Sequence, residues 1–176
     1  MQSLKRISIA SGVFVLLLLA IGFLLPSAWQ AERSVVIRAP APSIFPYLNS
    51  LKQWRAWTVW YQRHPDTATE YSGPDAGVGA TSRWSDEDGR GVMKIMHSER
   101  NRLVAYVVLF AAGEFRTEGT LTLVPEGEAT RVLWKSTGEV GRSPMNRYFA
   151  LFLGLRIGND FIDSLELLKQ KIEAKS

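Results

Sequence analysis

Two histidines, His64 and His97, are the side chains of this chain best suited to proton transfer near neutral pH. No cysteine occurs, and neither histidine has a ligand-spaced cysteine or carboxylate beside it, so no metal site is predicted. His97 lies one step of strand alternation beyond Met93 and Ile95. It could therefore point inward as an acid/base or as a hydrogen-bond partner of a ligand, or the strand end could leave it in solvent.

Two other motifs resemble chemical sites only superficially. The acidic run Asp86-Glu87-Asp88 is most simply a solvated hairpin turn, because the sequence offers its carboxylates no partner. Gly77 and Gly79 are not followed by a P-loop lysine, and no strand–loop–helix unit of the dinucleotide-binding kind surrounds them. The sequence therefore predicts no cofactor.

The composition indicates one folded domain, because 46% of the 176 residues are hydrophobic and 22% are charged. The absence of cysteine excludes disulfides, thiolate metal sites and cysteine nucleophiles. The formal net charge is +4, but Lys5 and Arg6 supply two of the 21 basic residues, which leaves 19 basic against 17 acidic. This near balance predicts no nucleic-acid partner, which would require basic residues massed on one face.

Residues 7–25 form an uncharged apolar run that is long enough to cross a bilayer once as a helix, at about 28 Å. The alternatives are a cleaved secretory signal and a buried core helix. We favour a retained anchor over a signal, because the apolar run exceeds the usual roughly 7–15 residues and Trp29 fits poorly two positions before a cleavage site at Ala31.

The charges flanking the apolar run predict its orientation. Lys5 and Arg6 precede it, and the positive-inside bias then places residues 1–6 in the cytoplasm and the domain on the extracytoplasmic, periplasmic side. Residues 26–31 would form a short linker, and residues 32–174 would form the single domain.

The pattern after the linker predicts a strand, two short helices, about six strands and a long C-terminal helix. Residues 32–39 are rich in β-branched side chains, Ser43 offers a helix N-cap, and a second short helix is expected over 51–57. Helical spacing of apolar residues returns after Pro144, with a cap or bend suggested near Gly158.

Period-2 alternation assigns faces to two of the strands. Phe115, Thr117 and Leu123 fall on one face of the strand at 114–124, while charged residues and threonines fall on the other. The strand at 131–136 repeats this pattern with Trp134 and Ser136 inward. This is the mark of an antiparallel sheet with one wet face.

Several short motifs follow one another in a characteristic order: Ile37-Arg38-Ala39-Pro40 with Ile44-Phe45, Trp54-Arg55-Ala56-Trp57 with Trp60, Tyr71-Ser72-Gly73-Pro74 before Gly77-Val78-Gly79-Ala80, Trp84, Gly91-Val92-Met93-Lys94-Ile95, Gly127, Thr130-Arg131-Val132-Leu133-Trp134, and Asp160-Phe161. Together they resemble the SRPBCC superfamily of START and birch-pollen-allergen-like proteins, in particular its bacterial polyketide cyclase/dehydrase-like branch. The resemblance covers roughly residues 33–173. Thr58-Val59 departs from the Ser-Pro usual in this branch.

The resemblance implies an α+β helix-grip fold, in which a curved antiparallel sheet of about seven strands wraps the C-terminal helix around an apolar cavity. The expected inward faces supply candidate ligand-binding residues, although each could instead be ordinary core packing: Trp84, Met93, Ile95, Phe115, Thr117, Trp134, Ser136, Phe149, Phe152 and Leu155. Trp57 and Trp60 are expected to pack within the fold rather than to line the cavity.

We therefore expect a membrane-anchored domain that binds a small hydrophobic ligand such as a lipid, a quinone or a polyketide-like molecule. Thr117, Ser136 or His97 would orient the ligand. Two other functions stay open: a polyketide cyclase or dehydratase, which needs an acid/base inside the cavity, and a structural envelope domain with a filled core. The size and lining of the space between sheet and helix would separate the three.

Overall fold

The computed structural model describes the backbone of all residues except 1, 87–88, 111–114, 142 and 176, and the side chains of all residues except these and 2–10, 15, 86 and 151. The side chains of the acidic turn at 86–88 therefore lie outside the described part of the structure. The element order is α1 (Gln2–Leu24), β1 (Ala28–Ile37), α2 (Ala41–Asn49), α3 (Leu51–Trp54), α4 (Val59–Arg63), β2 (Ala68–Ser72), β3 (Thr81–Asp86), β4 (Gly89–Glu99), β5 (Leu103–Phe110), β6 (Phe115–Glu126), β7 (Ala129–Glu139) and α5 (Pro144–Glu173).

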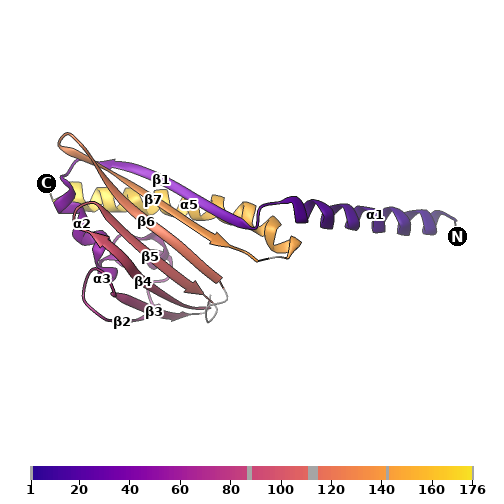
Figure 1. Ribbon diagram of the computed structural model, residues 1–176, viewed down its shortest axis with the longest axis horizontal. Helices are drawn as coiled ribbons and strands as arrows, with labels where there is room; N and C mark the ends of the chain where they lie inside the picture. Colours follow the sequence, from indigo (N-terminus) through magenta and orange to yellow (C-terminus); the bar gives the residue numbers. More distant parts are fainter. Residues whose placement is uncertain (1, 87–88, 111–114, 142, 176) are drawn as a thin grey trace.

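The seven strands form one antiparallel sheet in the order β1-β7-β6-β5-β4-β3-β2. The sheet curves, and α5 runs along it next to β1, while α2 and α3 lie at the end of the sheet far from α1 (Figure 1). Helix α4 packs against α5. This is the predicted α+β architecture of a curved antiparallel sheet and a long C-terminal helix. The helix cap considered near Gly158 is absent, because α5 is continuous from Pro144 to Glu173.

The N-terminal helix α1 projects away from the sheet (Figure 1). Among the residues whose side chains are described, no helix combines the length and the hydropathy of a membrane-spanning helix. The span predicted at 7–25 falls partly outside those residues, at 7–10 and 15. Strand β1 already begins at Ala28 and pairs with β7, so four of the six residues expected as a linker belong to the sheet.

Small residues on α5 let the helix approach β1 closely. A Cβ built on Gly154 would lie 2.9 Å from the carbonyl oxygen of Gln30, and one built on Gly158 would lie 2.6 Å from the guanidinium of Arg33. Ala150, one turn before Gly154, is buried. Residues four apart share a helix face, so this row of small residues fixes the rotation of α5 against the sheet.

The short helices pack two tryptophans into the core. Trp57 is fully buried and its indole nitrogen donates to the carbonyl of Tyr47 at 3.1 Å. Trp54 is buried too, and its indole nitrogen donates to the carbonyl of Leu48 at 2.9 Å. The packing role predicted for Trp57 is therefore confirmed. Helix α2 begins at Ala41 after Pro40 without a side-chain cap, and Ser43 lies within its first turn.

Candidate functional site

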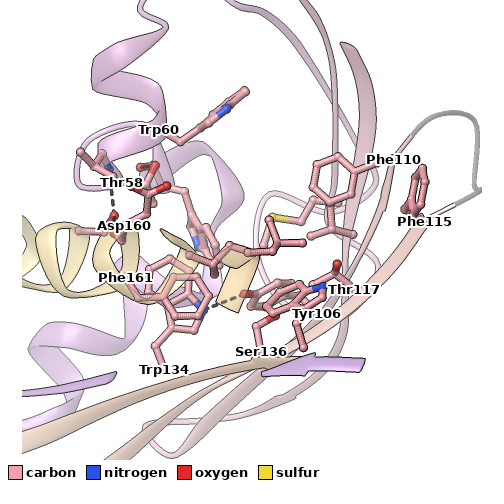
Figure 2. A pocket seen from close by; sticks show the side chains of 18 of the residues that line it. Thr58, Trp60, Tyr106, Phe110, Phe115, Thr117, Trp134, Ser136, Asp160 and Phe161 are labelled. Atoms are coloured by element: carbon pink, nitrogen blue, oxygen red, sulfur yellow. Dashed lines mark hydrogen bonds between the residues drawn. The ribbon is translucent and has the colours of Figure 1, made fainter. Parts of the chain in front are cut away.

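A cavity of about 630 Å³ lies between the inner face of the sheet and α5. This volume falls within the range of small-molecule binding sites, roughly 300–1,000 Å³. Aromatic side chains from the sheet, the short helices and α5 dominate its lining: Trp29, Trp54, Trp60, Tyr61, Trp84, Tyr106, Phe110, Phe115, Trp134, Phe149 and Phe161. Figure 2 shows Phe110 and Phe115 at one end of the cavity and Thr58, Trp60 and Asp160 at the other.

Six of the seven sheet residues predicted to face inward line the cavity: Trp84, Met93, Phe115, Thr117, Trp134 and Ser136. They come together because β3, β4, β6 and β7 each present alternate side chains to the same concave face. The seventh, Ile95, is fully buried in the core and does not line the cavity.

His97 does not reach the cavity, contrary to the inward orientation considered from the alternation. The pairing of β4 with β5 shifts by one residue between Ile95 and His97. A bulge of this kind reverses the alternation beyond it. The His97 ring is half exposed, with Nε2 3.0 Å from Oε1 of Glu99, and this pair lowers the pKa of the Glu99 carboxyl together with Arg102.

Two of the three α5 residues expected in the cavity lie outside it. Phe152 and Leu155 are exposed and absent from the lining, whereas Phe149 lines the cavity but is largely exposed. The apolar residues after Tyr148 are nearly continuous, so helical spacing alone does not select a face. The row of small residues at Ala150, Gly154 and Gly158 was the signal that could have selected it.

Several lining residues were not among the sequence candidates. Trp60, Tyr61 and Thr58 come from the loop and helix that follow Trp57. Tyr106 and Phe110 come from β5, whose apolar residues on both faces gave no basis for choosing the inward ones. Trp60 was expected to pack within the fold, and it does pack against the core while also lining the cavity.

Trp134, Tyr106 and Ser136 form a polar line along the cavity floor. The indole nitrogen of Trp134 donates to the hydroxyl of Tyr106 at 2.7 Å, and the hydroxyl of Ser136 donates to the carbonyl of Glu118 at 2.8 Å. Burial raises the pKa of Tyr106 to about 12, although its side-chain hydrogen bonding with Trp134 and Ser136 opposes this. Tyr106 is therefore a neutral phenol near neutral pH.

Thr117 offers the cavity a hydroxyl of a different kind. The side-chain hydroxyl of Thr117 makes no hydrogen bond within the part of the chain that the structure describes. The residue lines the cavity from β6. The Ser136 hydroxyl, by contrast, already donates its proton within the sheet. Of these two predicted orienting groups, Thr117 is the better placed to bind a polar atom of a ligand.

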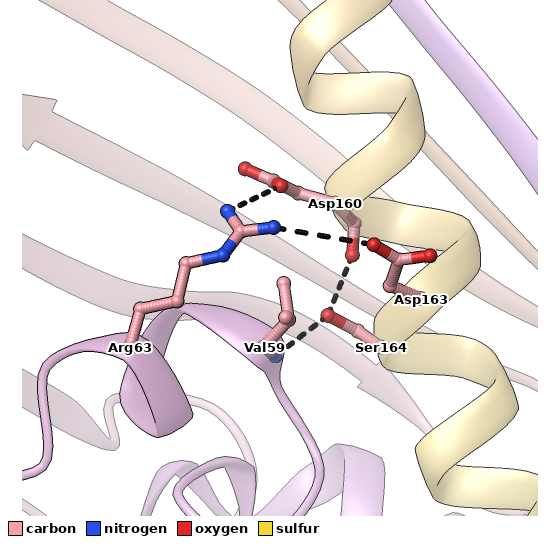
Figure 3. A network of polar contacts seen from close by, with 5 residues as sticks. All are labelled: Val59, Arg63, Asp160, Asp163 and Ser164. Carbon is pink, nitrogen blue, oxygen red and sulfur yellow. Dashed lines mark hydrogen bonds and ion pairs between the residues drawn. The ribbon is translucent and has the colours of Figure 1, made fainter.

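A polar cluster lies between α4 and α5, at the end of the cavity lined by Thr58 and Asp160 (Figure 3). Arg63 contacts Asp160 at 2.6 Å and Asp163 at 4.0 Å. The Ser164 hydroxyl donates to the Asp160 carbonyl at 2.6 Å and accepts the backbone N–H of Val59 at 2.9 Å. These bonds fix the start of α4 to the middle of α5.

Four ionisable residues line the described cavity: Tyr61, Tyr106, Glu139 and Asp160. Asp160 is engaged by Arg63, Glu139 is exposed at the end of β7, and Tyr61 and Tyr106 are phenols. Burial raises the pKa of Tyr61 to about 12. The hydrogen bond with Thr69 opposes this rise, and the neighbouring Tyr71 adds a smaller one. Within the described residues no group of three histidine, cysteine, aspartate or glutamate side chains could hold a metal ion.

A curved sheet gripping a long helix around an aromatic cavity defines a helix-grip protein. The chain belongs to the family described as polyketide cyclase / dehydrase and lipid transport, whose model matches residues 28–173. The predicted SRPBCC superfamily is thereby confirmed.

Solved structures share this fold at low sequence identity. A protein from Thermobifida fusca is 20% identical with a TM-score of 0.62, covering 81% of this chain and 92% of its own. A protein from Thermus thermophilus is 17% identical with a TM-score of 0.59, covering 84% and 99%. DynU16, from the dynemicin biosynthetic locus, is 15% identical with a TM-score of 0.58, and the match covers 84% of this chain but only 48% of DynU16. A comparison with curated proteins found no match.

Proposed function

We propose that this protein binds a small hydrophobic molecule in the cavity between the sheet and α5. The observation that carries the proposal is the cavity itself, about 630 Å³ in volume and lined mainly by apolar side chains, many of them aromatic. Burial of apolar ligand surface would drive binding at roughly 25 cal/mol per Å² removed from water. A structural domain with a filled core would leave no such space.

The state of the polar groups favours binding over proton transfer. Tyr61 and Tyr106 are protonated phenols near neutral pH, and burial, which raises their pKa values to about 12, makes them still weaker acids. His97 lies outside the cavity beside Glu99. We assign Thr117 the role of orienting a ligand carbonyl or hydroxyl, since its own hydroxyl is not committed to another described residue.

We further propose that α1 anchors the chain in a membrane, with the domain on the extracytoplasmic side. The support is the uncharged run at 7–25 and the preceding pair Lys5-Arg6. An anchor holds the cavity near molecules dissolved in the bilayer and so raises their effective concentration. The ligand class is then a membrane-derived apolar molecule such as a fatty acid, a phospholipid or a quinone.

Two matched variants on β6 test the ligand. Phe115 and Val124 are equally exposed, each at 43%, but only Phe115 lines the cavity. Full-length wild type, Phe115→Asp and Val124→Asp would be purified in the same detergent, and bound molecules would be extracted with solvent and counted by mass spectrometry. Lipid held around α1 is common to all three chains, so a difference reports on the cavity.

We expect wild type and Val124→Asp to retain the same apolar molecule in a fixed ratio to protein. Phe115→Asp should retain at least tenfold less, because a carboxylate at the cavity wall opposes an apolar ligand. Equal retention by all three chains, or none by wild type, would contradict binding in this cavity.

The anchor and its orientation have separate tests. A reporter enzyme fused after Ser176 that is active only outside the cytoplasm should be active in cells. Sequencing of the mature N-terminus should begin at or next to Met1. A mature N-terminus near Ala31 would overturn the anchor, and a reporter active only in the cytoplasm would overturn the orientation.

A further inference from the structure

The start of α5 carries an apolar stripe that the domain leaves uncovered. Met145, Phe149 and Phe152 stand at positions i, i+4 and i+7, so they share one face of the helix. They are 66%, 60% and 69% exposed. Large apolar side chains grouped in this way mark a contact surface rather than ordinary solvent exposure.

This part of α5 lies beside the end of α1. Arg147 donates through Nη1 to the carbonyls of Phe23 at 2.6 Å and Leu25 at 3.0 Å, and the Tyr148 hydroxyl donates to the carbonyl of Leu18 at 2.6 Å. The last carbonyls of a helix lack partners within it, so the Arg147 guanidinium satisfies these groups and complements the helix dipole. Figure 1 shows the first turns of α5 next to the C-terminal end of α1.

These contacts set the depth of α5 relative to α1. The carbonyl of Leu18 lies six residues before Leu24, which is about 9 Å along a helix axis. With α1 in a bilayer, the Tyr148 hydroxyl therefore lies about that far below the end of the anchor. Helices that lie in a membrane interface bury their apolar face by a similar roughly 5–10 Å.

The charges on this segment match an anionic lipid surface. Between Pro144 and Asn159 the only charged residues are Arg147 and Arg156, and the first carboxylate of α5 is Asp160. A helix with an apolar face and basic residues beside it is typical of binding at the membrane interface.

The stripe is continuous with the open end of the cavity. Phe149 belongs to both, and Phe110 and Phe115 also line the cavity while remaining partly exposed. We propose that residues 144–155 of α5 lie in the lipid headgroup region, so that the rim formed by Phe110, Phe115 and Phe149 opens toward the bilayer. A ligand then enters from the lipid and not through water. This inference rests on the proposed anchoring by α1.

Because the chain has no cysteine, single labels can measure depth directly. Spin labels would be attached to Phe152→Cys and Met145→Cys on the stripe, to Phe14→Cys on α1, and to Val124→Cys as an exposed control at the far end of β6. Each full-length variant would be reconstituted in vesicles of phosphatidylcholine and phosphatidylglycerol. Collisions of the label with oxygen, which partitions into lipid, are compared with collisions with a water-soluble nickel chelate.

We expect the ratio of oxygen collisions to nickel collisions to be several-fold higher for the labels at 152 and 145 than for the label at 124. Labels at 152 and 145 that favour nickel while the label at 14 favours oxygen would overturn this inference and leave the anchor standing. Labels at 14, 145 and 152 that all favour nickel would overturn both. Labels at 145 and 152 shielded from both reagents would indicate a protein partner or a second copy, and would also overturn the inference.

Discussion

Trp134 stacks on Phe161 with ring centroids 3.9 Å apart and planes tilted by only 8°. The contact joins β7 to α5 at the floor of the cavity, and both rings line it. Trp54 and Trp57 meet the same indole edge to face at 5.5 Å and 5.4 Å. One side chain thus connects the sheet, the short helices and the gripped helix.

We expect Trp134→Ala to lower the free energy of unfolding by about 3–5 kcal/mol, as is typical of large aromatic truncations in cores. Trp134→Phe should lose less, because a ring still stacks on Phe161. Denaturant unfolding followed by circular dichroism measures both values. A loss below about 1 kcal/mol for Trp134→Ala, the scale of surface substitutions, would contradict the central position of this side chain.

Two glycines of α5 should respond in opposite ways to alanine. At Gly154 the new Cβ meets the backbone carbonyl of Gln30, which cannot move freely, so Gly154→Ala should destabilise the fold by about 1–3 kcal/mol. At Gly158 the Cβ meets the flexible end of Arg33, which can move away. Gly158→Ala should therefore leave the free energy of unfolding unchanged or raise it by up to about 1 kcal/mol, because alanine has the higher helix propensity. Thermal unfolding of the two variants in parallel checks this. Similar effects at both positions would show that α5 does not press on β1 as described.

Ser164→Ala should cost about 1–3 kcal/mol of stability, because the partly buried N–H of Val59 loses its acceptor. The start of α4 should loosen, and with it Trp60 at the cavity wall. Hydrogen exchange at the Val59 amide is the direct measurement, and Ser164→Thr, which keeps the hydroxyl, is the control. Unchanged exchange in Ser164→Ala would contradict the role of this bond.

Stability should fall as pH rises from 10 to about 12. In this window the unfolded chain releases the Tyr106 proton at its ordinary pKa, whereas the folded chain retains it because burial raises the pKa to about 12. The slope attributable to Tyr106 approaches about 1.4 kcal/mol per pH unit. This slope is obtained by measuring the free energy of unfolding against pH for wild type and for Tyr106→Phe and subtracting the two slopes. Equal slopes would contradict the raised pKa.

Strand alternation predicted most of the sheet's contribution to the site. On β7, Trp134 and Ser136 are buried as expected, and on β6 Leu123 is buried as expected. The alternation succeeds here because one face of these strands packs on α5 or the cavity while the other meets solvent. On β5 both faces are apolar, and the sequence could not show that Tyr106 and Phe110 line the cavity.

The failures have local physical causes. The bulge after Ile95 turns His97 outward, and nothing in the residue types of β4 announces an extra residue. The exposed position of Phe152 depends on the rotation of α5, which close packing at Gly154 sets. Apolar periodicity carries little information in a segment that is apolar on every side, whereas the spacing of small residues would have given the rotation.

The connection between α1 and the sheet consists of only residues 25–27, and the carbonyl of Ser27 accepts the N–H of Val140 within it. With α1 in a bilayer, so short a connection prevents the domain from rotating freely about its anchor and from moving away from the membrane surface. A carrier that shuttles cargo across an aqueous compartment needs free diffusion or a long tether. This protein would instead act as a stationary receptacle that takes molecules from one leaflet, and any handover would require the acceptor to come to it.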